Sequence, residues 1–207
     1  MALKGSGSDV ASSFIEAAAA DTDGISTAAS ISGAANLTIG GALASGGSVT
    51  MDCPRNVTIL SAGDDSGITF TVTGTDESGT AITEVITGAD TGTATGSSFF
   101  QTVTQIATSG SSAGNVSAGS GTSCSGVISA SRCRLRGIYV VNGSGAATLK
   151  FREGSATGTI IMQFATVAGA STNSYPDIPD DGLLFKAGGY VTFTAVTDLT
   201  AMTTFFS

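Results

Sequence analysis

The sequence predicts an all-β fold, and three observations support this prediction. Short runs of residues alternate between apolar and polar side chains, as strands with one buried face do. Almost every interval between these runs contains glycine, a residue typical of turns. The runs recur roughly every 8–14 residues, a spacing typical of sandwiches and small barrels. We therefore expect two small sandwich- or barrel-like modules with Gly-rich turns, preceded by a short N-terminal arm or helix.

The clearest strand pair lies between residues 64 and 88. Ile68, Phe70 and Val72 alternate with threonines, so the apolar side chains fall on one face of a strand. The turn signal Asp76-Glu-Ser-Gly79 follows, and residues 81–87 resume the alternation. This order predicts an antiparallel hairpin.

Residues 1–35 form the expected N-terminal arm, which is rich in Ala, Ser and Gly. Residues 10–20 are compatible with one short helix capped by Ser8 or Asp9, and equally with an extended arm that orders against a partner. The large apolar residues are few, so the arm cannot build a core of its own. We expect it to pack on another chain, with interface residues Leu3, Val10, Phe14 and Ile15.

Two β-rich modules are expected after the arm, at residues 36–120 and 121–207. The Gly- and Ser-rich stretch 109–123 is the least hydrophobic part of the chain and is predicted to link them. In the second module, Asn142-Gly-Ser-Gly145 and Glu153-Gly-Ser-Ala-Thr-Gly158 are predicted hairpin turns. Residues 175–182 contain two prolines and are expected to form an irregular loop.

Composition argues against catalysis and against a cofactor. Histidine is absent, which excludes Ser-His-Asp and Cys-His sites and histidine metal ligands. We therefore expect a non-enzymatic protein with no cofactor and no metal site. Calcium at Asp64, Asp65 and Asp76 is the open alternative, although Asp is also an ordinary turn residue.

The three cysteines do not suggest a disulfide framework, because their number is odd. Cys124 and Cys133 are close enough in sequence to meet across a hairpin. The simpler interpretation treats Cys53, Cys124 and Cys133 as small buried side chains of a protein made in the cytoplasm.

Charge is unevenly distributed along the chain, whose net charge is −8. Up to Ser120 there are two basic and eleven acidic residues, and from Gly121 on there are six basic and five acidic residues. The acidic balance argues against a nucleic-acid partner. No signal peptide or membrane-spanning segment is predicted, so we expect no membrane partner.

Arginines and paired phenylalanines are the candidate contact residues. Arg132, Arg134 and Arg136 alternate, so on a strand they share one face, and Arg152 is placed to join them across the predicted hairpin. Such a stripe suits a carboxylate-rich surface of another copy, the alternative being a solvated strand face. In Phe99-Phe100 and Phe205-Phe206 one ring of each pair must point outward.

Several segments together resemble a structural module of tailed-bacteriophage virion proteins. Within residues 20–120 they are Asn36-Leu-Thr-Ile-Gly-Gly-Ala-Leu43, Arg55-Asn-Val-Thr-Ile59, Ser61-Ala-Gly-Asp-Asp-Ser-Gly67, Phe70-Thr-Val-Thr-Gly-Thr-Asp76, Thr83-Glu-Val-Ile-Thr-Gly-Ala89 and Phe100-Gln-Thr-Val103. Leu135-Arg-Gly-Ile-Tyr-Val-Val-Asn-Gly-Ser-Gly145 through Pro179-Asp-Asp-Gly-Leu-Leu-Phe185 resembles C-terminal modules of phage and cyanophage structural proteins. The resemblance implies a many-copy virion component and transfers no catalytic residue.

The resemblance does not say which part of the virion the chain belongs to. A small two-module β protein without long fibrous repeats or a coiled-coil stalk can clamp neighbouring capsomers, so we expect a capsid decoration (cement) protein, assembled in the host cytoplasm and retained in the virion. Its expected partners are the major capsid protein or other virion proteins and copies of itself, as a trimer. The alternative is a tail or fibre component, an adhesin that binds a host surface polysaccharide.

Overall fold

The computed structural model describes residues 10–169, 172–194 and 196–207, and these residues form an all-β protein. The only helical element among them is a single 3-10 turn, η1 (Val196–Asp198). The expected fold class is therefore confirmed. The first nine strands are β1 (Ala11–Glu16), β2 (Asp21–Ser30), β3 (Ala44–Ser45), β4 (Ser48–Asp64), β5 (Thr69–Thr75), β6 (Ala81–Thr87), β7 (Asp90–Thr95), β8 (Phe100–Thr108) and β9 (Asn115–Ser129). The others are β10 (Cys133–Asn142), β11 (Thr148–Glu153), β12 (Thr159–Ala165), β13 (Asn173–Ser174), β14 (Leu183–Phe185), β15 (Gly189–Phe193) and β16 (Leu199–Phe206).

The chain folds into two compact units. The central unit comprises Glu16–Gly126 and Phe193–Thr197. The terminal unit comprises the described part of Met1–Ile15, with Val127–Thr192 and Asp198–Ser207. These divisions fall at residues 15/16 and 126/127, whereas the sequence suggested 35/36 and 120/121. The difference arises because strands β1 and β9 carry the chain from one unit into the other.

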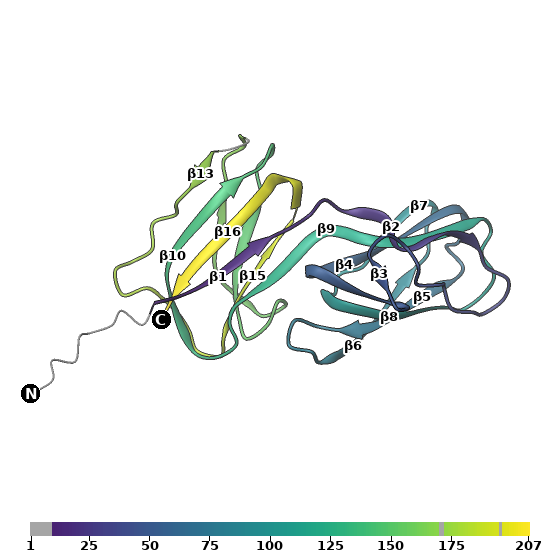
Figure 1. Ribbon diagram of the computed structural model, residues 1–207, viewed down its shortest axis with the longest axis horizontal. Coiled ribbons are helices and arrows are strands. Elements are labelled where there is room, and N and C mark those ends of the chain that lie inside the picture. Colours follow the sequence, from purple (N-terminus) through teal and green to yellow (C-terminus); the bar gives the residue numbers. More distant parts are fainter. Residues whose placement is uncertain (1–9, 170–171, 195) are drawn as a thin grey trace, which may run out of the picture. The chain divides into compact units, whose positions relative to one another are not determined.

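The central unit is organised by the 17-residue strand β4 (Figure 1). Its first part pairs with β3 and β8, and its second part pairs with β7 and β9. Irregular register around Arg55 separates the two parts. A strand that changes partners in this way joins the two layers of a sandwich. The core between them contains Ile25, Val57, Phe70, Phe100, Ile106 and Val116, among other apolar side chains.

The hairpin predicted at residues 64–88 is confirmed. Strands β5 and β6 pair in continuous antiparallel register from Thr69 opposite Thr87 to Thr75 opposite Ala81. Phe70 and Val72 are fully buried, while the alternating threonines are half-buried. The Asp76 carboxylate closes the turn by accepting hydrogen bonds from two backbone N–H groups, at Ser78 and Thr80.

The prediction of a linker at residues 109–123 was wrong, because most of this stretch belongs to β9. Its small residues are required by close packing. A Cβ on Gly119 would overlap the backbone of Asp21 and Thr22 in β2. Val116 and Ala118 face the core of the central unit. A strand that lies very close to another backbone needs small residues such as glycine and serine. Flexible linkers are rich in the same residues, so composition does not distinguish the two.

In the terminal unit, the first sheet has the strand order β1-β16-β10-β13, with β14 also paired to β10. The second layer contains β12, β11, β15 and the end of β9. The hairpin predicted at residues 142–145 was wrong, because β10 lies in the first sheet and β11 in the second. The turn predicted at residues 153–158 is confirmed, since it joins the antiparallel pair β11 and β12.

The N-terminal segment differs from both forms expected for it. Residues 11–16 form strand β1 rather than a helix, and Phe14 and Ile15 point in opposite directions, as they do in a strand. β1 adds to β16 in the terminal unit, and β2 adds to β9 in the central unit. This segment therefore completes the sheets of its own chain and does not need another chain to order it. Residues 1–9 lie outside the described part.

Candidate interaction surface

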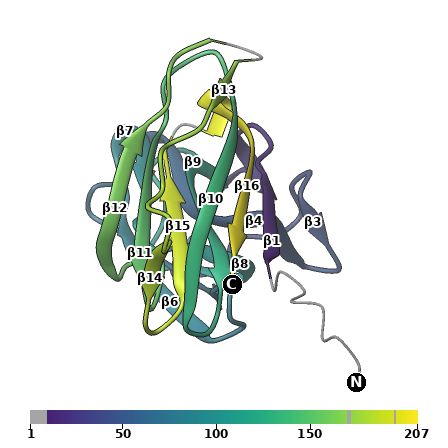
Figure 2. The same cartoon turned by 90° about the vertical axis from the view of Figure 1, so that its left-hand side faces the viewer.

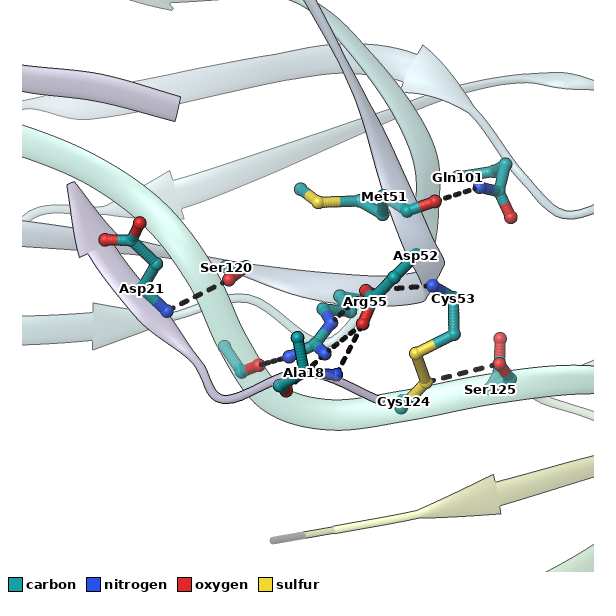
Figure 3. A network of polar contacts seen from close by, with 11 residues as sticks. Ala18, Asp21, Met51, Asp52, Cys53, Arg55, Gln101, Ser120, Cys124 and Ser125 are labelled. Carbon is teal, nitrogen blue, oxygen red and sulfur yellow. Dashed lines mark hydrogen bonds and ion pairs between the residues drawn. A yellow bond between two sulfur atoms is a disulfide. The ribbon is translucent and has the colours of Figure 1, made fainter. Parts of the chain in front are cut away.

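An ion pair between a buried arginine and a partly exposed aspartate is a highly connected polar feature of the central unit (Figure 3). Arg55 is 1% exposed. Its Nε and Nη2 donate to the two oxygens of Asp52, each at 2.7 Å. The same guanidinium donates to the backbone carbonyls of Ala18 and Gly121. One side chain thus connects β4, β9 and the segment before β2.

Asp52 is ionised at neutral pH in this arrangement. Burial by itself raises the pKa of the Asp52 carboxyl, but the bonds from Arg55 and from the backbone N–H groups of Ala18 and Cys53 outweigh burial and lower it. The four hydrogen bonds of Arg55 all reach acceptors within the central unit, so the cluster stabilises the fold.

Cysteine pairing differs from both interpretations of the sequence. Cys53 and Cys124 form a disulfide between β4 and β9, with their Cα atoms 6.3 Å apart. Cys133 is a free, buried thiol at the start of β10, and burial raises the pKa of Cys133. The pairing of Cys124 with Cys133 considered from the sequence is wrong. The two bonded residues are 71 positions apart, so spacing alone could not reveal them.

The acidic turns serve local structure. Asp64 accepts from the backbone and hydroxyl of Ser66, and Asp65 is buried and accepts from the backbone N–H of Ala113. The hydrogen bonds from Ser66 lower the pKa of Asp64. Among the described residues, no group of three or more acidic or cysteine side chains is placed to hold a metal ion. In the same part of the chain, no helix has the length and apolar character needed to cross a bilayer.

The outer face of the β1-β16-β10-β13 sheet carries the most distinctive surface of the terminal unit, and Figure 2 shows these strands beside one another. We call it the aromatic face. It consists of Phe14, Arg134, Arg136, Tyr139, Tyr175 and Phe205. Strand alternation places the side chains on β1, β10 and β16 outward, because their neighbours Ile15, Leu135, Ile138 and Thr204 are buried. Tyr175 directly follows β13 and is 65% exposed.

Four aromatic rings form this face. The rings of Tyr139 and Tyr175 lie 5.2 Å apart between centroids, at 55° to each other. Phe205 lies opposite Gly137, and a Cβ on that glycine would be 3.6 Å from the phenylalanine ring. Phe14, Tyr175 and Phe205 are 62%, 65% and 39% exposed. Exposed rings of this number are unusual on a free surface and are enriched at contacts between proteins.

The side chain of Tyr175 remains neutral at physiological pH. Partial desolvation, followed by the neighbouring Tyr139 hydroxyl, raises the pKa of Tyr175 above its ordinary value. The exposed Tyr175 side chain therefore presents a ring and a hydroxyl group without charge.

Two of the predicted arginines border these rings. Arg134 Nη1 donates to the backbone carbonyl of Asp181 at 2.9 Å, and Arg136 Nη1 donates to that of Asp180 at 3.1 Å. Arg136 Nε also donates to the Ser207 hydroxyl. The guanidinium groups are thus held in fixed positions by the loop before β14. In the described residues neither arginine forms an ion pair, so their charges remain available to an acidic partner.

The remaining candidate residues are placed as follows. Phe14 joins the aromatic face, Val10 is 46% exposed just before β1, and Ile15 is buried in the core. Arg132 is exposed in the turn before β10. Arg152 lies on β11 in the other sheet, where it donates to Thr192 and Gly158, so the expected stripe of four arginines is wrong. Leu3 lies outside the described residues.

The Tyr139–Tyr175 contact was not predicted from the sequence, although one outward ring in the Phe205-Phe206 pair was. Tyr175 lies in a Pro-rich loop, and the contact arises because β13 returns alongside β10, with Asn173 opposite Val141. No local sequence pattern predicts that β13 pairs with β10. The alternation around Tyr139, with Ile138 and Val140 inward, does indicate its outward direction.

Comparison with known proteins identifies no relative. No family model matches the chain, and no curated protein or solved structure gives a significant match. The resemblance to phage virion proteins therefore stays a prediction, and function is argued from the surface described above.

Proposed function

We propose that this chain is a non-enzymatic structural protein of a tailed-bacteriophage virion, and specifically a capsid decoration (cement) protein. The observation that carries the proposal is the aromatic face. Exposed rings bordered by fixed arginines have the composition of protein-contact surfaces, where tyrosine and arginine contribute most of the binding energy. The described residues offer a surface for adhesion and no group poised for chemistry.

In this proposal the aromatic face binds the major capsid protein or another virion protein. The sequence suggests copies arranged as trimers around threefold positions of the shell, without nucleic acid or membrane as partner. The Cys53–Cys124 disulfide suits a protein assembled in the reducing host cytoplasm and oxidised after the particle is released.

The proposal is tested by measuring the copy number of this protein in purified virions with quantitative mass spectrometry. Hundreds of copies per particle are expected for a decoration protein. A dozen or fewer would place it in the tail, and its absence from particles would overturn the virion assignment.

Attachment through the aromatic face is tested separately by adding purified protein to particles that lack it. The double variant Tyr139→Ser/Phe205→Ser should reduce occupancy at least tenfold, since each ring contributes on the order of 1–2 kcal/mol at a contact. Val85→Ser is the matched control, because Val85 is also an exposed apolar strand residue, 62% exposed on β6 of the central unit. If occupancy fell equally in the double variant and in Val85→Ser, the aromatic face would not be the attachment surface.

A tail or fibre component that binds a host polysaccharide is the second candidate. The observation favouring it is the ring pair of Tyr139 and Tyr175, beside which Asn173 places its side-chain amide against Tyr175. Rings beside neutral hydrogen-bonding groups are a composition that can contact sugars. Binding of purified protein to host polysaccharide, lost in Tyr175→Ser while particle attachment is retained, would favour this candidate.

A further inference from the structure

Strand β12 forms an uncovered edge of its sheet. It is the last strand in the order β12-β11-β15-β9, and β11 is its only strand partner among the described residues. Figure 2 shows it at the rim of that sheet. An edge strand directs every second backbone N–H and C=O away from its sheet, so these groups remain free to pair with another strand.

This edge lacks most of the features that usually keep strands apart. No charged residue occurs between Gly154 and Pro176. Ile160, Ile161 and Val167 are 42%, 36% and 71% exposed. The strand has a bulge, because Met162 lies opposite Phe151 and Ile160 lies opposite Arg152. The bulge leaves residues 162–165 in regular register with residues 148–151, and this regular segment is not blocked by charge or proline.

The opposite edge, at β6 in the central unit, is different. Glu84 lies in the middle of that strand, and its carboxylate accepts hydrogen bonds from Ser97 and Ser98. Two copies paired through β6 would bring these carboxylates together. A charge in the middle of an edge strand is a common way of preventing such pairing.

The charges of the two units favour a second copy as the partner of β12. The central unit contains ten acidic residues and one arginine, a net charge of −9. The described part of the terminal unit contains six basic and five acidic residues, a net charge of +1. Identical copies therefore repel strongly through their central units and hardly at all through their terminal units, to which β12 belongs.

We propose that β12 pairs antiparallel with β12 of a second copy about a twofold axis, which continues the sheet from one molecule into the next. In such a contact each residue faces its own sequence in reverse, so a strand without charge is compatible with itself. Ile160, Ile161 and Val167 then lose water at the contact. This inference does not depend on the proposed function, and it gives a twofold association in place of the trimer expected from the sequence.

The test is sedimentation equilibrium of the full chain from about 1 µM to about 1 mM, a range that covers weak and moderate dimers. The wild type should pass from monomer to dimer. The variant Ile160→Glu/Ala165→Glu should remain monomeric. Its new carboxylates face Arg152 and Thr148 within the monomer, so the fold should tolerate them. Val85→Glu, at the other edge, is the control and should dimerise like the wild type.

Hydrogen exchange of the wild type provides a second readout that needs no variant. Amides of residues 160–165 should exchange several-fold more slowly at dimer-forming concentration than in dilute solution. A wild type that stays monomeric at the highest concentration would overturn the proposal. So would a trimer, a dimer whose β12 amides show no added protection, or a dimer abolished by Val85→Glu alone.

Discussion

A single buried arginine holds the centre of the central unit together. Arg55 contacts Asp52 on its own strand and carbonyls of two other segments. A buried guanidinium that loses its counter-charge is costly, because water cannot replace the lost partner. The composition of the chain gives no sign of this role, since a lone arginine in an acidic stretch resembles an ordinary surface residue.

We predict that Asp52→Asn lowers the free energy of unfolding by about 1–3 kcal/mol at pH 7. The value is below that of a fully buried pair, because the Asp52 side chain is 33% exposed. The folded state lowers the pKa of Asp52 from its ordinary value of 3.8. The stabilisation is therefore present above about pH 4 and is lost as pH falls through the folded-state pKa.

Urea unfolding of wild type and variant at pH 7 and pH 3 checks this prediction. The difference between the free energies of unfolding of the two proteins should be smaller at pH 3 than at pH 7. Asp64→Asn is the matched control, because hydrogen bonds from Ser66 also lower the pKa of Asp64 but its carboxylate lies at the exposed surface. If wild type and Asp52→Asn differed in free energy of unfolding by the same amount at both pH values, the role assigned to the ion pair would be contradicted.

At the scale of elements, local patterns predicted local pairing and little else. The hairpin of β5 and β6 could be predicted because its alternation and its turn lie within about twenty consecutive residues. The signal at residues 142–145 is equally strong, yet it joins strands in different sheets. A turn motif predicts that the chain reverses direction. It does not predict whether the two strands that it joins pair with each other.

Strand β9 shows the opposite error, in which an ordered strand has the composition of a linker. Glycine at position 119 is required because the backbone of the neighbouring strand β2 approaches it too closely for a side chain, at an irregularity of the pairing. The sequence records the glycine but not the strand that requires it. The aromatic face was incompletely predicted for the same reason, since 36 residues separate Tyr139 from Tyr175.

We predict that Gly119→Ala destabilises the protein by more than about 2 kcal/mol, because the added methyl group cannot be accommodated without moving β2 or β9. Gly67→Ala should change stability by less than about 1 kcal/mol, since nothing lies within 4 Å of a Cβ at that glycine. Thermal unfolding of the two variants checks the difference. Similar midpoint temperatures for the two variants would mean that β2 and β9 can move apart at Gly119 at little cost.

At the scale of the whole molecule, covalent reinforcement is confined to one unit. The Cys53–Cys124 disulfide joins two strands of the central unit, and the terminal unit contains the free Cys133. Each unit also has its own buried residues, so each is able to unfold as a cooperative body.

We predict two calorimetric transitions, of which only one responds to a reducing agent. Reduction should lower the stability of the central unit by about 2–4 kcal/mol, because the disulfide closes a long loop in the unfolded chain. The midpoint temperature of the terminal unit's transition should not change on reduction. Thiol titration of the unfolded chain should give one reactive thiol before reduction and three afterwards. A single transition whose midpoint temperature falls on reduction would show that the two units unfold together.

The position of β16 has a consequence for the order of events during synthesis. This strand lies between β1 and β10 in the first sheet of the terminal unit, yet the ribosome makes it after both of them. Almost all of the central unit has emerged by then and can fold early. β1 has no strand partner, and Ile15 stays uncovered, until β16 has been translated. A nascent chain stalled before Leu199 would therefore hold a finished central unit and a terminal sheet without its middle strand, a form that chaperones and proteases recognise.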